Sequence, residues 1–184
     1  MSRPYRLRIA ETARRHVVVE DGVECALDLL QIVPREEETQ ILSEELARRG
    51  FVIETGRARR EAASGVVVEI DLAARRVHVG KRSERTVEKT EVRVVASETA
   101  EVTDEQRAAV RRQAEAALDD ERERERRAVT AELEAGLADL RAELDRISVK
   151  VTQEALRRKA ARLGEIESVA EDPETGSLTI RIRV

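Results

Sequence analysis

The sequence predicts an α+β protein with antiparallel sheets of short strands, one short helix, a long charged helix or helical hairpin, and a C-terminal helix followed by a β-hairpin. Two observations predict this class. Several short segments alternate apolar and polar residues, which is typical of strands with one buried face. A capping-box spacing at Thr103 and Gln106 then opens a helical region that runs from about residue 104 to residue 147.

The N-terminal segment predicts strands. Residues 5–9 alternate with period two. Residues 16–20 and 23–30 read as a hairpin, because Asp21-Gly22 supplies the positive φ values that a two-residue turn needs. The second strand of this hairpin would place four side chains on one face: Val23, Cys25, Leu27 and Leu29.

A short amphipathic helix is expected next. Pro34 suits a first helical turn, and the acidic residues 36–38 suit the positive end of the helix dipole. Apolar residues recur at helical spacing, and Gly50 stands where a left-handed C-cap belongs. Residues 51–54 then predict a strand.

The next stretch predicts a polar loop and a second hairpin. Residues 56–64 are polar and are assigned to a loop. Residues 66–71 pair with 76–79 across a four-residue connection, and residues 86–96 form a further strand at a sheet edge.

The helical region contains a charged segment and an apolar repeat. Residues 119–127 hold no apolar side chain, so they form either a solvated helix or the bend between two helices. After them, six apolar residues follow a heptad spacing of 4, 3, 4, 3 and 4. We call these six the leucine seam: Leu133, Leu137, Leu140, Leu144, Ile147 and Val151.

The C-terminal segment predicts a helix and two strands. Thr152 caps a helix over 153–163 that Gly164 ends. A strand over 165–170, a turn over 172–176 and an alternating strand over 178–184 follow, and we expect the last strand to return to the N-terminal sheet. These elements suggest three parts: a β-rich α+β domain over 1–100, a helical arm over 101–151, and an α-β-β unit over 152–184 that packs on the N-terminal sheet.

Composition and charge exclude several function classes. Aromatic residues make up 1% of the chain, which argues against base-stacking modules and aromatic cages. The balance of 34 basic and 38 acidic residues offers no bulk attraction to phosphate. One cysteine excludes an internal disulfide and fits a reducing compartment, so we expect a cytoplasmic protein. No segment is apolar for the length of a membrane span.

No catalytic, cofactor-binding or metal-binding set is recognisable. Cys25 and His16 are the one candidate nucleophile and base, and they would be only diagonal neighbours in the predicted hairpin. A buried structural cysteine is therefore expected. His16 and His78 lack further ligands at a zinc spacing, and we predict no metal, no cofactor and no enzymatic activity.

Two features remain as binding candidates. The leucine seam either packs inside the chain or, if exposed, binds a partner or forms a coiled coil between two chains. The helical arginines would be needed for nucleic-acid binding, which is disfavoured because acidic residues are interleaved with them. These arginines are Arg111, Arg112, Arg122, Arg124, Arg126 and Arg127.

Part of the chain resembles a known family of domains. Residues 155–164, the strand after them, the turn over 172–176 and the strand over 177–184 resemble small accessory domains of bacterial ternary systems. Those systems couple an FtsH-type AAA+ component, a MoxR-type AAA+ ATPase and a von Willebrand factor A protein. The hairpin over 66–79, after Gly50-Phe51, is similar too.

The resemblance implies a function but no site residues. It implies a non-enzymatic accessory or adaptor protein of an NTP-dependent conflict or stress system, with the AAA+ ATPase and the von Willebrand factor A protein as partners. Two alternatives stay open beside it: a self-associating coiled-coil protein, and a nucleic-acid-binding protein that uses the arginine-rich helix.

Overall fold

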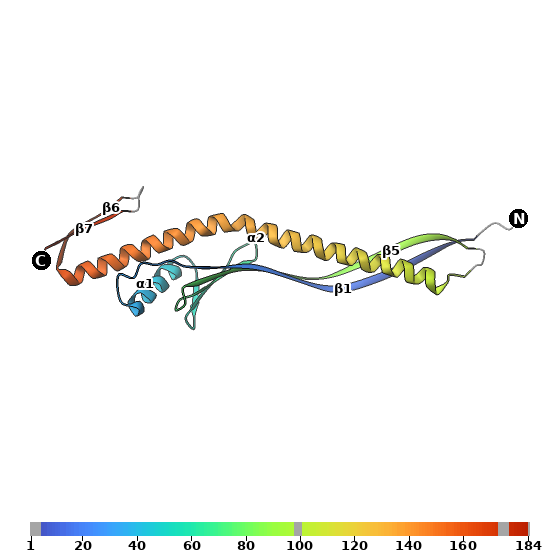
Figure 1. Cartoon of the computed structure of the whole chain (residues 1–184), viewed down its shortest axis with the longest axis horizontal. Coiled ribbons are helices and arrows are strands. Elements are labelled where there is room, and N and C mark those ends of the chain that lie inside the picture. The colour runs from blue at the N-terminus through green and yellow to red at the C-terminus, as the bar shows by residue number, and fades with distance from the viewer. Residues whose placement is uncertain (1–4, 98–100, 173–176, 184) are drawn as a thin grey trace. The chain divides into compact units, whose positions relative to one another are not determined.

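The structure is a computed structural model that describes residues 5–97, 101–172 and 177–183. It confirms the α+β class, with two helices, a five-stranded antiparallel sheet and a separate pair of C-terminal strands (Figure 1). The elements in chain order are β1 (Tyr5–Ala26), α1 (Arg35–Arg48), β2 (Val52–Glu54), β3 (Arg57–Glu61), β4 (Val66–Asp71), β5 (Arg76–Ser97), α2 (Asp104–Leu163), β6 (Glu165–Glu171) and β7 (Leu178–Arg183).

The chain divides into two compact units, and β1, β5 and α2 each contribute to both. Unit 1 comprises the described residues of Met1–Asp21 and Arg82–Glu132. Unit 2 comprises those of Gly22–Lys81 and Leu133–Val184. The three-part division expected from the sequence stays a prediction.

In unit 2, strands β2 to β5 are joined in hairpin order. The strand order is β1-β5-β4-β3-β2, and every pair between β2 and β5 is antiparallel. The predicted pairing of 66–71 with 76–79 is confirmed, with Val66 opposite Lys81 and Asp71 opposite Arg76. The predicted loop over 56–64 was wrong, because Arg57–Glu61 is strand β3. Ala58 in that strand is fully buried, whereas its charged neighbours made the segment look like a loop.

The connection between β2 and β3 explains why a polar sequence can turn here. Thr55 has φ 46° and Gly56 has φ 79°. Two successive positive φ values are those of a type I′ turn, whose twist matches that of the strands it joins. The register follows, with Glu54 opposite Arg57.

Helix α1 begins and ends where the sequence predicted. Pro34 is its N-cap residue, and Glu36–Glu38 lie in its first turn. Gly50 has φ 82°, the left-handed conformation that follows many helix ends. Its buried face consists of Ile41, Leu42 and Leu46 together with one carboxylate, Glu38.

The core of unit 2 is a continuous apolar cluster between the sheet, α1 and the C-terminal half of α2. Alternate residues of β4 and β5 point into it, including Ile70 and Val77, which are both fully buried. Helix α1 contributes Leu46, and α2 contributes Ile147. Aliphatic side chains supply almost all of this core, because Phe51 is its one aromatic member.

Helix α2 is a single helix rather than two. Its N-terminus has the predicted capping box: the Gln106 N–H donates to Thr103 Oγ1 at 3.2 Å, and the Thr103 N–H donates to Gln106 Oε1 at 3.1 Å. The charged residues 119–127 lie within it. The expected second helix start at Thr152 was wrong, because Thr152 lies inside α2.

Unit 1 combines the first part of β1, the last part of β5 and the first part of α2. Val17, Val19 and Val129 form its small buried cluster, with Val87 packed against them. The two strands also interact through side chains, since the hydroxyl groups of Thr12 and Thr90 lie 2.8 Å apart.

The predicted hairpin at Asp21-Gly22 was wrong, because β1 continues through both residues. A Cβ on Gly22 would lie 3.0 Å from the Val79 carbonyl oxygen of the neighbouring strand β5. The glycine therefore allows two strands to approach closely, and it is not used for a turn.

The C-terminal strands form their own sheet. Strands β6 and β7 pair with each other, with Ile166 opposite Ile182 and Val169 opposite Ile180. The expected return of the last strand to the N-terminal sheet was wrong, because β7 has β6 as its neighbour. Most of the predicted turn over 172–176, and residue 184 of the predicted strand, lie outside the described residues.

Candidate functional site

The leucine seam is divided between the core and an open groove of unit 2. Leu133, Leu144, Ile147 and Val151 are buried members of the apolar core. Leu137 and Leu140 are only partly buried against that core. This burial favours packing within the chain over a coiled coil between two chains, since a coiled coil would need the whole seam.

The groove lies between α2 and the last residues of β1, and its volume is about 670 Å³. Its apolar wall on the helix side is formed by Leu137, Leu140 and Leu144. Val149 also lines it and is 43% exposed. The opposite wall consists of Val23, Cys25, Ala26 and Leu27.

The alternation of β1 explains why the groove is open. Val23 and Cys25 share the face of β1 that points toward the core, as the period-two pattern predicted. The predicted strand over 23–30 was too long, because β1 ends at Ala26, before Leu27 and Leu29. Leu27 is buried in the core, whereas Val23 is 40% exposed and Cys25 is exposed as well. The core face of the sheet therefore extends beyond the area that α2 covers. An exposed apolar surface beside a packed core is a candidate for an interaction site.

The expectation of a buried cysteine was wrong, because Cys25 lies on this uncovered part of the sheet. The ring of His16, the candidate base, lies in unit 1, with Nε2 3.1 Å from Glu84 Oε1 and Nδ1 3.4 Å from the Thr86 hydroxyl. Within the described ranges no group of three metal-ligating side chains occurs.

The rim of the groove is charged. Asp28, Arg141 and Asp145 line it, and all three side chains are exposed. None of the three makes an ion pair with another residue that the structure describes. Two carboxylates and one guanidinium therefore surround the apolar walls, with an excess of one negative charge.

An ion pair beside the groove fixes the helix wall to the sheet. Arg60 of β3 donates two hydrogen bonds to Glu143 of α2, at 2.7 and 2.6 Å, and its guanidinium lies 4.4 Å from the Phe51 ring centroid. The hydrogen bond from Arg60, together with its charge, holds the pKa of the Glu143 carboxyl below its usual range, although partial burial acts in the opposite direction. Glu143 immediately precedes Leu144, so this pair positions the groove wall.

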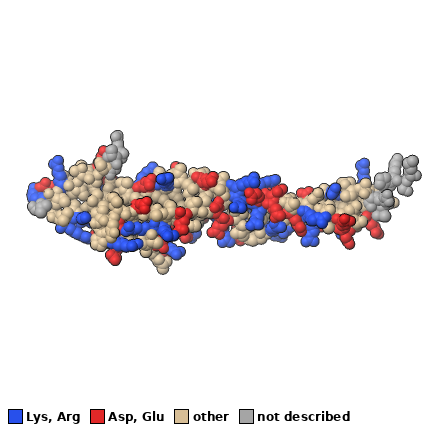
Figure 2. Space-filling model, viewed as in Figure 1, with Lys and Arg blue, Asp and Glu red and all other residues tan. Residues whose placement is uncertain are grey.

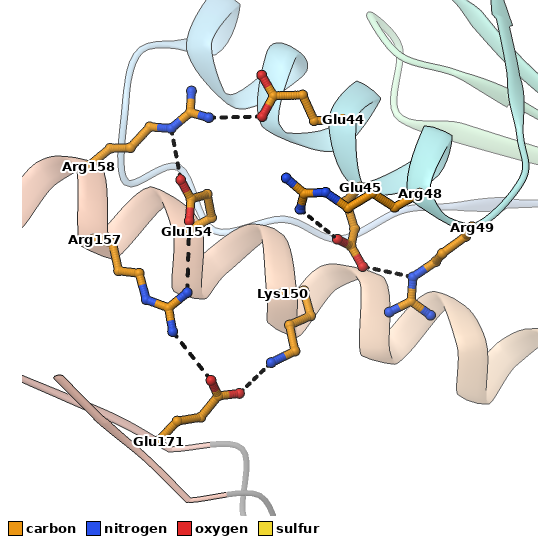
Figure 3. A network of polar contacts seen from close by, with 9 residues as sticks. All are labelled: Glu44, Glu45, Arg48, Arg49, Lys150, Glu154, Arg157, Arg158 and Glu171. Atoms are coloured by element: carbon orange, nitrogen blue, oxygen red, sulfur yellow. Dashed lines mark hydrogen bonds and ion pairs between the residues drawn. The ribbon is translucent and has the colours of Figure 1, made fainter.

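A second network connects α1, α2 and β6 (Figure 3). Arg158 of α2 contacts Glu44 of α1 at 3.0 Å and Glu154 at 3.1 Å. Arg157 contacts Glu171 of β6 at 3.3 Å, and Lys150 pairs with the same carboxylate. The hydrogen bond from Lys150 lowers the pKa of Glu171. Charged side chains thus hold α1 and the C-terminal strands to one helix.

Three of the six helical arginines form ion pairs within the chain. Arg111 pairs with Glu115, Arg124 with Glu121 and Arg127 with Glu123. Two further members, Arg122 and Arg126, lie beside Glu20, Asp119 and Glu123 around a shallow polar depression of unit 1. Such mixed charge offers no continuous track for a phosphate backbone.

The comparisons with known proteins identify the family. A family model described as "FtsH ternary system domain X5" matches residues 1–184. The chain belongs to this family. A search of curated proteins and a search of solved structures found no match. None of the described helices combines the length and the apolar character needed to cross a membrane.

Membership in the family agrees with the resemblance that the sequence showed. The family name places the domain in an FtsH ternary system, a system of several components, and this is consistent with an accessory role. The family name does not indicate where the leucine seam or the groove lies. Sequence reasoning found the helix side of the groove through the heptad spacing, and it missed Val149 and the exposure of Val23 and Cys25.

Proposed function

We propose that this FtsH ternary system domain is a non-enzymatic adaptor that binds a partner protein of its system through the groove of unit 2. The partners that the resemblance suggests are an AAA+ ATPase of the FtsH or MoxR type and a von Willebrand factor A protein. The observation that carries the proposal is the apolar surface between α2 and β1, which the chain leaves open beside a well-packed core.

The chemistry of the groove indicates what occupies it. Leu137, Leu140 and Val149 offer apolar contacts to a side chain or a short segment. Asp28 and Asp145 at the rim favour a basic residue at the flank of that segment. We therefore propose as occupant a segment of the partner protein with apolar residues in its centre and a basic residue beside them.

The strand side of the groove suggests an extended conformation for this segment. In unit 2 the last residues of β1 are at the end of the strand order, next to β5. An exposed strand edge can pair with an added strand, whose alternate side chains then enter the adjoining pocket. The affinity would come from main-chain hydrogen bonds and the specificity from the apolar walls.

The test uses a substitution at the exposed part of the groove. The purified chain is mixed with the AAA+ ATPase and the von Willebrand factor A protein of its own system, and binding is measured by interferometry. Val149→Glu should weaken binding by about tenfold or more, because it places a carboxylate against an apolar partner surface next to Asp145.

The matched control is Val92→Glu in the part of β5 that belongs to unit 1. Val92 is 45% exposed and Val149 is 43% exposed, so both changes place a carboxylate at a similarly accessible position. Val92→Glu should leave binding unchanged. Equal binding by the wild type and Val149→Glu would exclude the groove as the site. Absence of binding to every component of the system would overturn the adaptor function itself.

A further inference from the structure

The C-terminal strand pair is a separate, open sheet. Strands β6 and β7 have only each other as neighbours among the described strands. None of their described residues is buried, and Val169 is 42% exposed. A two-stranded sheet is marginally stable by itself and gains stability from a third strand or from packing on a helix.

One face of this pair is apolar, and one end of the pair is attached to α2 by ion pairs. Leu178, Ile180 and Ile182 alternate along β7 and share one face, and Glu171, opposite Leu178, pairs with Lys150 and Arg157 of α2. At the other end a Cβ on Gly164 would clash with the Arg183 carbonyl oxygen. The pair is thus attached to α2 at Glu171 and approaches the helix–strand junction at Gly164, and no other described strand pairs with either edge.

The charges of the two strands are complementary. The acidic residues belong to β6, where Glu167 contacts Arg183 at 2.6 Å and Glu165 lies opposite the same arginine. The basic residues belong to β7. Arg181 lies opposite Ser168 and makes no ion pair within the described part of the chain. Arg181 is therefore the cation of β7 that no described carboxylate neutralises.

We propose that the open edge of β7 receives an extended acidic segment of a partner protein as a third strand. Main-chain hydrogen bonds would supply affinity, and an acidic residue beside Arg181 would supply specificity. The alternate residues of the added strand would be apolar and would extend the face formed by Leu178, Ile180 and Ile182. This surface is separate from the groove of unit 2 and does not depend on the function proposed for it.

Charge selects the occupant. Two copies of β7 placed side by side would bring arginines opposite arginines, which is unfavourable. A charged edge also discourages indiscriminate pairing with neutral strands. An acidic strand is the one that gains from this edge, and β6 is an example of such a strand in the chain itself.

The probe is a fluorescent, end-blocked peptide with the sequence of residues 165–171, Glu-Ile-Glu-Ser-Val-Ala-Glu, and binding to the full chain is measured by anisotropy. A second peptide carries lysine at its three glutamate positions and should bind about tenfold more weakly. A third peptide carries N-methyl groups at alternate residues, which removes main-chain hydrogen-bond donors. It should also bind about tenfold more weakly than the acidic peptide.

Variants of the protein locate the site. Arg181→Glu should weaken binding of the acidic peptide by about tenfold and should strengthen binding of the lysine peptide. The control Arg8→Glu, at an exposed position of β1, should change neither affinity. Val149→Glu should also leave peptide binding unchanged, which separates this proposal from the groove.

Three results would overturn the proposal. The first is equal binding of the acidic and lysine peptides, and the second is binding that N-methylation does not weaken. The third is self-association of the chain alone, measured by light scattering, that Arg181→Glu abolishes, because the edge would then receive β6 of a second copy. Circular dichroism of each variant verifies that the fold is intact.

Discussion

Unit 1 and unit 2 use the same three elements, β1, β5 and α2, and stabilise them differently. In unit 2 these elements join α1 and the other strands around a continuous apolar core. In unit 1 the buried cluster consists of Val17, Val19 and Val129 with Val87 beside it. Four further apolar side chains in the described part of unit 1 are buried outside this cluster: Ile9, Val110, Ala114 and Leu118. Charged side chains supply many of the remaining contacts of unit 1.

The charged contacts of unit 1 form a ladder between strand and helix. Arg85 of β5 contacts Glu121 at 2.9 Å and Glu125 at 2.7 Å, and Lys89 contacts Glu121 at 3.1 Å. Basic and acidic side chains alternate over the visible face of this part of the molecule (Figure 2). Exposed ion pairs contribute little stability each, whereas apolar burial contributes about 25 cal/mol for each Å². The comparison therefore indicates that unit 2 is the stable part of the chain.

The largest expected difference comes from deleting buried apolar atoms. Ile147→Ala in unit 2 should lower the free energy of unfolding by about 3–4 kcal/mol, since Ile147 is fully buried in a large core. Val129→Ala in unit 1 removes fewer atoms from a small cluster and should cost about 1–2 kcal/mol. Hydrogen exchange measured over a range of urea concentrations gives the loss of unfolding free energy for each variant. Equal losses for the two variants would contradict the difference between the units.

The next largest loss of stability is expected from removing the Arg60–Glu143 ion pair. Glu143→Gln should destabilise unit 2 by about 1–2 kcal/mol at pH 7. Because Arg60 lowers the pKa of Glu143 in the folded state, this stabilisation is fully present above the ordinary carboxyl pKa of 4.5 and is lost as the pH falls through the lower folded value. The difference between variant and wild type should therefore shrink in acid. Glu134→Gln, at an exposed position of the same helix, is the control and should leave the free energy of unfolding at pH 7 nearly unchanged.

The capping box of α2 provides a test of helix continuity. Thr103→Ala removes the acceptor for the Gln106 N–H and should cost about 1 kcal/mol of local stability in unit 1. Thr152→Ala lies within the helix and should be neutral or slightly stabilising, because alanine has the higher helix propensity. Hydrogen exchange of the amides near each substitution measures both changes in local stability. A loss at Thr152 as large as that at Thr103 would mean that a second helix begins there.

The smallest effect concerns salt and the charged ladder. The hydrogen bond from Lys89 lowers the pKa of Glu121, so the ladder stabilises unit 1 above the ordinary carboxyl pKa and loses this contribution as the pH falls through the lowered value. Raising the salt concentration should speed hydrogen exchange in residues 116–127 and leave residues 140–155 nearly unchanged. Glu121→Gln should reduce the salt dependence of the first segment. Identical salt responses in the two segments would show that ion pairs do not distinguish the units.

Local signals predicted much of this fold correctly. The Thr103–Gln106 capping box, the φ of Gly50 and the pairing of 66–71 with 76–79 each depend on residues close together in sequence. The charged residues 119–127 could be either helix or bend by sequence alone. Ion pairs three and four residues apart, such as Arg127–Glu123, support the helix.

Long-range contacts account for what the sequence could not predict. Asp21-Gly22 has the composition of a turn, but a long partner strand continues the pairing through it, and the turn preference is overridden. The candidate site shows the same limit. The heptad spacing identified Leu137 and Leu140, whereas the open groove depends on how far α2 covers β1. That coverage is a property of packing between segments that are more than one hundred residues apart.

Gly164 determines how the C-terminal strands can vary during evolution. Gly50, at the end of α1, has open space around its Cβ position, and the constraint there is its positive φ. Asparagine also adopts positive φ at helix ends, so it is a tolerable replacement. At Gly164 the Arg183 carbonyl occupies the place of any side chain, and even alanine must displace β7. In a library of all single substitutions, position 164 should therefore be depleted of every alternative, whereas Gly136, with open space around it in α2, should be enriched in alanine. Two helix–glycine–strand junctions that look alike in sequence are thus under different selection.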